Sequence, residues 1–70
     1  MVTYVVSQHA KYWDVARYID DLNGQPIIRT RSEKEALNAV IKEAAQEKPS
    51  RVLHIALNGE SNEVARFDAR

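Results

Sequence analysis

The chain contains no cysteine, so it can form neither a disulfide nor a thiolate metal site. Its only histidines are His9 and His54, whereas a transition-metal site needs three or four ligands at suitable spacing. It has two glycines, each preceded by asparagine, and therefore lacks a glycine-rich phosphate loop. No apolar run approaches the roughly 20 residues that a membrane-spanning helix requires. These absences predict a protein without a metal, a cofactor or a membrane segment.

The chain also lacks an excess of charge of either sign. Ten basic and ten acidic residues give a formal net charge of zero, and the two signs are interspersed along the sequence. Proteins that bind nucleic acid usually present a basic face, because phosphate neutralisation supplies most of their nonspecific affinity. The balance of charge therefore favours a protein partner over nucleic acid.

Catalytic groups are equally scarce. Asp20 and Asp21 lie in a segment dense in turn-forming residues, and a role in that turn explains them. The serines lack a nearby arrangement of histidine and aspartate that would activate a nucleophile. A pocket in which an acid and a base converge is rare in a chain of 70 residues. We therefore predict that the chain is not an enzyme.

The length of 70 residues predicts a single domain over residues 1–70, and it limits how much surface folding can bury. A domain of this size buries only about 60% of the surface that its unfolded chain exposes. Self-association is then the remaining source of stability. Residues 1–8 lack the positive start and cleavage site of a signal peptide, so we expect a cytoplasmic protein from a bacterium or phage.

Residues 30–49 have the pattern of one complete amphipathic helix. Ser32 and Glu35 form a capping box, in which the hydroxyl accepts from the Glu35 amide and the Glu35 side chain reaches back. Pro49 prevents the helix from continuing. The apolar residues recur at helical spacing and form one stripe: Ala36, Leu37, Val40, Ile41, Ala44 and Ala45. We expect this stripe to pack on the rest of the chain.

The remaining segments are typical of β-strands, because they alternate in polarity or are rich in β-branched and aromatic residues. They span residues 3–7, 12–19, 25–29, 51–57 and 63–67. The segment 51–57 is the most apolar, so we predict that it is the central strand. The sequence thus predicts an α+β fold of order β-β-β-α-β-β, in which one helix covers one face of an antiparallel sheet of about five strands.

Several of these strands carry apolar residues on both faces, and one helix can cover only one of them. Tyr4 and Val6 alternate with Val5, and Trp13 and Val15 alternate with Tyr18. We therefore expect the uncovered face to be partly apolar and aromatic, as surfaces that contact a partner often are. The alternative is that tyrosine rings and arginine stems shield this face. The pattern leaves open which set lies under the helix, because a shift of one residue exchanges the two.

Three short motifs resemble a family of small bacterial and phage domains of unknown function. They are Tyr4-Val5-Val6, Trp13-x-Val15 and Ser32-x-x-Glu35-Ala36. The resemblance covers nearly the whole chain and implies a compact α+β domain without an assigned activity. Residues 12–45 are also similar, more weakly, to the arm-binding domain of tyrosine recombinases, which binds DNA through its sheet.

Five residues are candidates for a contact surface, because tyrosine and arginine are enriched at protein interfaces and can also stack on bases. They are Tyr12, Arg17, Tyr18, Arg29 and Arg31. Our interpretation is a non-catalytic domain that acts through protein contact, as a homodimer joined by the open sheet face or by an edge strand. Two alternatives remain, a nucleic-acid-binding module that uses the same tyrosines and arginines, and a phage-type inhibitor that docks on a host enzyme.

Overall fold

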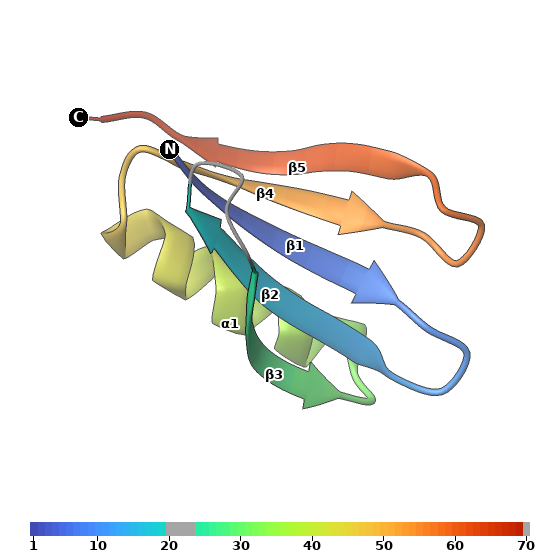
Figure 1. The fold of residues 1–70 in the computed structure, drawn as a ribbon. Helices are drawn as coiled ribbons and strands as arrows, with labels where there is room; N and C mark the ends of the chain where they lie inside the picture. Colours follow the sequence, from blue (N-terminus) through green and yellow to red (C-terminus); the bar gives the residue numbers. More distant parts are fainter. Residues whose placement is uncertain (20–23, 70) are drawn as a thin grey trace.

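A computed structural model describes residues 1–19 and 24–69 of the chain (Figure 1). Its elements are β1 (Val2–Gln8), β2 (Trp13–Ile19), β3 (Gln25–Thr30), α1 (Glu33–Gln46), β4 (Ser50–Ile55) and β5 (Ser61–Phe67). The predicted order of strands and helix is confirmed. The turn predicted at Asp20 and Asp21 lies outside the described residues.

All five strands form one sheet of order β3-β2-β1-β4-β5, in which only β1 and β4 pair in parallel. The prediction of a wholly antiparallel sheet is therefore wrong. The cause is the helix, since α1 returns the chain to the end of the sheet where β1 begins, and β4 then runs in the same direction as β1. The prediction that residues 51–57 form the central strand is also wrong, because β1 takes that place. Both β1 and β4 are inner strands, so high apolar content alone does not identify the central one.

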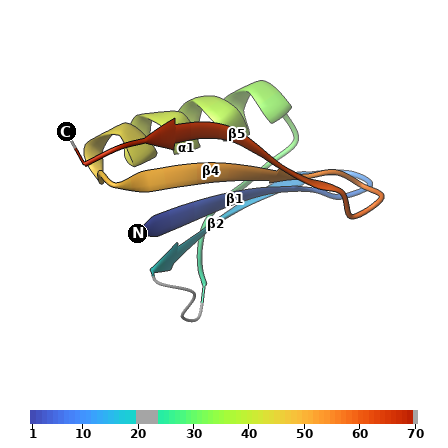
Figure 2. The same ribbon diagram turned by 90° about the horizontal axis from the view of Figure 1, so that it is seen from above.

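The helix lies along one face of the sheet and leaves the other face uncovered (Figure 2). The fully buried apolar residues come from both layers: Tyr4, Val6, Val15, Ala36, Val40, Ala44 and Val52. Strand register aligns Val6 with Val15 and Tyr4 with Val52 on the helix side. The structure thus answers the question of register, because Tyr4, Val6 and Val15 belong to the covered face and Val5 to the open one.

The helix packs through small side chains. Its buried residues are Ala36, Val40 and Ala44, which follow one another at intervals of four and form a narrow row. The prediction is wrong for Ile41, which is 40% exposed, since it lies about 100° around the helix from Val40. Leu37 is half-buried and packs against the edge of the core.

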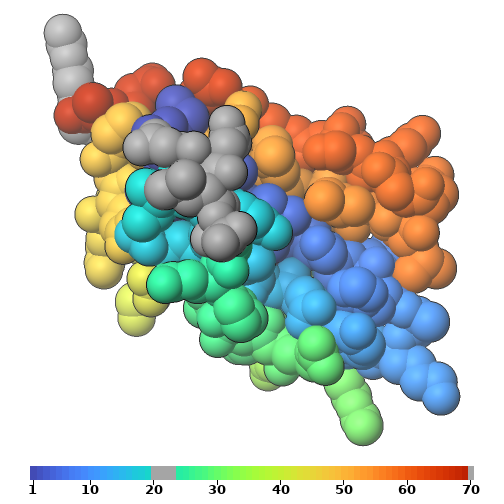
Figure 3. All heavy atoms as spheres, in the orientation of Figure 1, coloured from blue at the N-terminus to red at the C-terminus, as the bar shows by residue number. Residues whose placement is uncertain are grey.

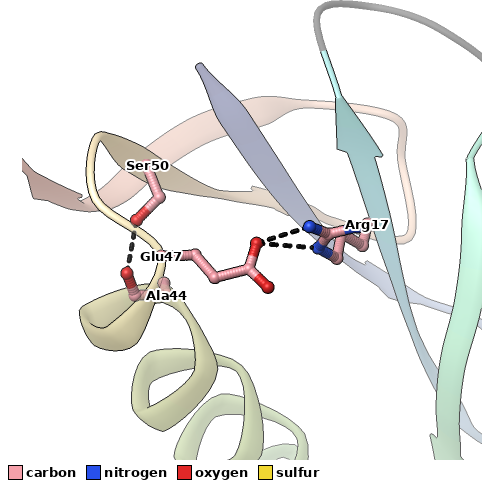
Figure 4. A network of polar contacts seen from close by, with 4 residues as sticks. All are labelled: Arg17, Ala44, Glu47 and Ser50. Atoms are coloured by element: carbon pink, nitrogen blue, oxygen red, sulfur yellow. Dashed lines mark hydrogen bonds and ion pairs between the residues drawn. The ribbon is translucent and has the colours of Figure 1, made fainter.

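Both ends of α1 are fixed by side-chain hydroxyls. At the start, Ser32 Oγ accepts from the Glu35 amide at 3.3 Å, as predicted. The Glu35 carboxylate, however, accepts from Thr30 Oγ1 at 2.8 Å, and Thr30 Oγ1 in turn accepts from the Ser32 amide at 3.2 Å. At the other end, the buried Ser50 hydroxyl donates to the Ala44 carbonyl at 2.6 Å (Figure 4). The Ser32 hydroxyl thus satisfies an amide that the helix leaves without a partner, and the Ser50 hydroxyl is a second donor to the Ala44 carbonyl, which also accepts from the Glu47 amide at 3.2 Å.

Candidate functional site

The sheet surface opposite α1, here called the open face, has no helix or strand packed on it among the described residues. In the space-filling view of Figure 3 the strands make up most of the coloured area of this face, and the helix appears only at its margin. Side chains on neighbouring strands form rows across a sheet, because paired residues point to the same side. The middle row of the open face is Pro26, Ala16, Val5, Leu53 and Glu63. Its centre is therefore apolar.

The rows on either side of the middle row are mostly polar. One contains Tyr18, Thr3, Arg51 and Arg66, and the other contains Arg29, Asp14, Ser7, Ile55 and Ser61. Thr3 is only 8% exposed although no helix covers it, and Arg51 Nε donates to its hydroxyl at 3.1 Å. The open face therefore has an apolar stripe along its middle row. In the row beside it, Arg51 partly covers Thr3.

Ion pairs lie at both sides of this stripe. Arg29 Nε donates to Asp14 Oδ1 at 3.0 Å near β3, and Arg66 Nε donates to Glu63 Oε1 at 2.7 Å on β5. The hydrogen bond that Glu63 accepts from Arg66 lowers the pKa of Glu63, and the hydrogen bond that Arg29 donates to Asp14 raises the pKa of Arg29. The border of the open face therefore carries both signs of charge in matched pairs.

Three of the five predicted contact residues meet in one hollow. Tyr12, Arg29 and Arg31 line it together with Lys11 and Thr30, and its volume is about 640 Å³. We call this site the basic hollow. It forms where the loop between β1 and β2 approaches the end of β3, just before α1 begins.

Next to the basic hollow, four side chains form a connected cluster. The rings of His9 and Tyr12 stack with centroids 4.5 Å apart, and Arg29 Cζ lies 4.5 Å from the centre of the Tyr12 ring. Asp14 contacts both residues that lie against the Tyr12 ring. One carboxylate oxygen accepts from Arg29, and the other lies 3.2 Å from His9 Nε2. The Tyr12 ring, predicted as a platform for bases, is therefore already in contact with two side chains.

The other two predicted residues lie elsewhere. Arg17 is on the covered face, where its Nε donates to Glu47 Oε2 at 3.0 Å and joins β2 to the end of α1 (Figure 4). This bond raises the pKa of Arg17. Tyr18 lies on the open face at the opposite end of β2 from Tyr12, and a Cβ at Gly24 would stand 2.5 Å from its ring. The five residues therefore do not form one surface.

Sequence reasoning missed Lys11, His9, Asp14 and Thr30 at this site. The alternation predicted for residues 12–19 places Tyr12 and Asp14 on one side, which was a usable signal. The contact between Asp14 and Arg29 depends on the pairing of β2 with β3, where Asp14 is opposite Arg29. That register could not be read from either strand alone.

Comparison with protein-family models, with curated proteins and with solved structures finds no match. The resemblance to the bacterial and phage domains stays a prediction. Within residues 1–19 and 24–69, no helix has the length and apolar character to cross a membrane. In the same part of the chain, no group of three or more His, Cys, Asp or Glu side chains is placed to hold a metal ion.

Proposed function

We propose that the chain is a non-catalytic interaction domain that acts through protein contact, and that its partner is a second copy bound at the open face. The observation that supports this proposal most directly is the apolar stripe of Ala16, Val5 and Leu53, which crosses the three inner strands. All three are only half-buried in the single chain. An apolar centre with a polar border is the usual composition of a protein interface.

The two edges of the sheet support contact through the face rather than through a strand. Each edge strand contains a β-bulge, with Ile27 as the extra residue in β3 and Val64 in β5. Bulges interrupt the regular row of backbone donors and acceptors that an added strand would need. Of the two predicted routes to a dimer, the structure therefore favours the open face.

The distribution of charge is compatible with self-association. The formal net charge is zero, so two copies do not repel each other as whole molecules. A two-fold axis brings the same surface of both copies together, and the paired charges at its border supply both signs to the opposite copy. No separate partner is needed to complement this surface.

The area of the face sets the expected strength of the dimer. Strands about 4.8 Å apart and about 23 Å long give five strands a face of roughly 550 Å² per copy. This is below the roughly 800 Å² per partner of a standard interface. We therefore expect a weak dimer that dissociates in the micromolar range, as small interfaces commonly do.

Sedimentation velocity over a concentration series from about 5 to 500 μM tests this proposal, because the range spans the expected Kd. Leu53→Lys places a charge in the middle of the stripe and should leave a monomer at every concentration. Ile41→Lys is the matched control, since Ile41 is 40% exposed on the outer side of α1. Circular dichroism verifies that both variants are folded. A monomeric wild-type chain throughout the series, or equal losses for the two variants, would contradict the proposal.

A further inference from the structure

We infer that the basic hollow binds the phosphate group of a small phosphorylated molecule. The hollow is lined by Lys11, Tyr12, Arg29, Thr30 and Arg31, and it lies at the end of the sheet where β3 leads into α1. This site lies outside the apolar stripe, and Arg29 belongs both to its lining and to the border of the open face. The inference is based on three features. They are the contacts that orient Arg29, the two further cations Lys11 and Arg31, and the size of the hollow.

Two contacts orient Arg29 before any ligand arrives, and its side chain is 67% exposed. Its Nε donates to Asp14 at 3.0 Å, and its guanidinium lies over the ring of Tyr12 at 4.5 Å. Its two terminal nitrogens make no hydrogen bond to the residues that the structure describes. A planar guanidinium fixed at Nε presents these nitrogens as a fork, which matches two oxygens of one phosphate group.

Lys11 and Arg31 supply two more positive charges to the same hollow. Neither forms an ion pair or a side-chain hydrogen bond within residues 1–19 and 24–69. The carboxylates in contact with the lining residues are Asp14, bound to Arg29, and Glu35, bound to Thr30. Three cations against two carboxylates leave a local positive charge in a chain whose net charge is zero.

The shape of the site favours a phosphate ester over a nucleic-acid base or a carboxylate. A base would compete for the Tyr12 ring, because this ring already contacts His9 and Arg29. A phosphate monoester carries up to two negative charges and three free oxygens, enough for all three cations, whereas one carboxylate carries a single charge. The volume of about 640 Å³ falls within the usual range for small-molecule sites and leaves room for the organic part of the ligand.

Titration of the ¹⁵N-labelled full chain by NMR tests this inference, with glycerol 3-phosphate as the probe and succinate as a dianion without phosphorus. We expect saturable shifts of the amides of residues 11–12 and 29–31, with tighter binding of the phosphate ester than of succinate. Lys11→Gln and Arg31→Gln should each weaken binding about five-fold, because each removes one charged contact. Both residues are exposed, and the dispersion of the same spectra shows whether each variant is folded.

The matched control is Lys42→Gln, which removes the same charge from an exposed position on α1 that does not line the hollow. Its affinity should equal that of the wild-type chain. Shifts that never saturate, equal binding of succinate, or an equal loss with Lys42→Gln would each overturn the inference.

Discussion

The two faces of the sheet are made by alternate residues of the same strands, yet they differ in what they contribute. In β1, Tyr4 and Val6 point to the helix and are fully buried, whereas Val5 between them is half-buried on the open face. The covered face packs against the row of Ala36, Val40 and Ala44 on α1, whereas ion pairs lie at the border of the open face. The difference predicts a division between the faces, in which the covered face contributes most of the stability and the open face contributes little. Substitutions at equivalent positions on the two faces test this division.

The largest expected difference is between the two tyrosines Tyr4 and Tyr18. Tyr4→Ala removes a fully buried ring from the core and should lower the free energy of unfolding by about 3–5 kcal/mol. A domain of this size has about that much stability in total, so the variant should be largely unfolded. Tyr18→Ala removes a half-exposed ring from the open face and should cost only about 1 kcal/mol. Urea unfolding followed by circular dichroism measures both, and similar losses would mean that the two faces contribute equally.

A smaller difference is expected between two serines. Ser50→Ala removes the buried hydroxyl that donates to the Ala44 carbonyl, and the free energy of unfolding should fall by about 1–3 kcal/mol. Ser7→Ala on the open face should change it by less than about 0.5 kcal/mol, because Ser7 is half-exposed and a surface substitution has little effect. Thermal unfolding of the two variants under identical conditions gives the comparison. A Ser7 variant as unstable as the Ser50 variant would contradict it.

The smallest effect concerns pH and the hydroxyl of Tyr4. Burial raises the pKa of Tyr4, and its buried hydroxyl has no hydrogen-bond partner among the described residues. Above pH of about 10 the unfolded chain loses this proton while the folded chain keeps it, so stability falls as pH rises. This contribution is fully present below the unfolded pKa and is lost as pH passes through the raised, folded pKa.

Tyr4→Phe isolates that contribution, since it removes the titrating group and retains the ring. At neutral pH the variant should be at least as stable as the wild-type chain, because it removes a buried hydroxyl that has no hydrogen-bond partner within the described residues. At alkaline pH it should be the more stable of the two. Urea unfolding at several values between about pH 8 and 11 measures the difference. Parallel curves for the two proteins over that range would show that the hydroxyl has no altered pKa.

The sequence predicted the elements well, because each depends on local patterns. The alternation of side-chain polarity with a period of two predicted β2. Ser32 and Pro49 predicted the two ends of the helix. The strand order escaped prediction, since it depends on where α1 returns the chain. Ile41 was assigned to the buried stripe because it is apolar, whereas the sheet contacts a narrower row centred on Val40.

The candidate site was predicted only in part, for a similar reason. Tyrosine and arginine were recognised as suitable contact residues, but their grouping depends on strand register and on the loop between β1 and β2. Arg17 could not be separated from the others by composition, because its distinguishing feature is a contact with Glu47, which lies 30 residues away in the chain. Long-range ion pairs of this kind leave no local pattern in a sequence.

The bulges at Ile27 and Val64 also bear on how the chain behaves when it is crowded. Fibrils grow when straight, regular strands of many molecules stack in step with one another. Here, a straight incoming strand would fall out of step by one residue on passing either bulge. The bulges therefore make the two outermost strands poor templates for fibril growth.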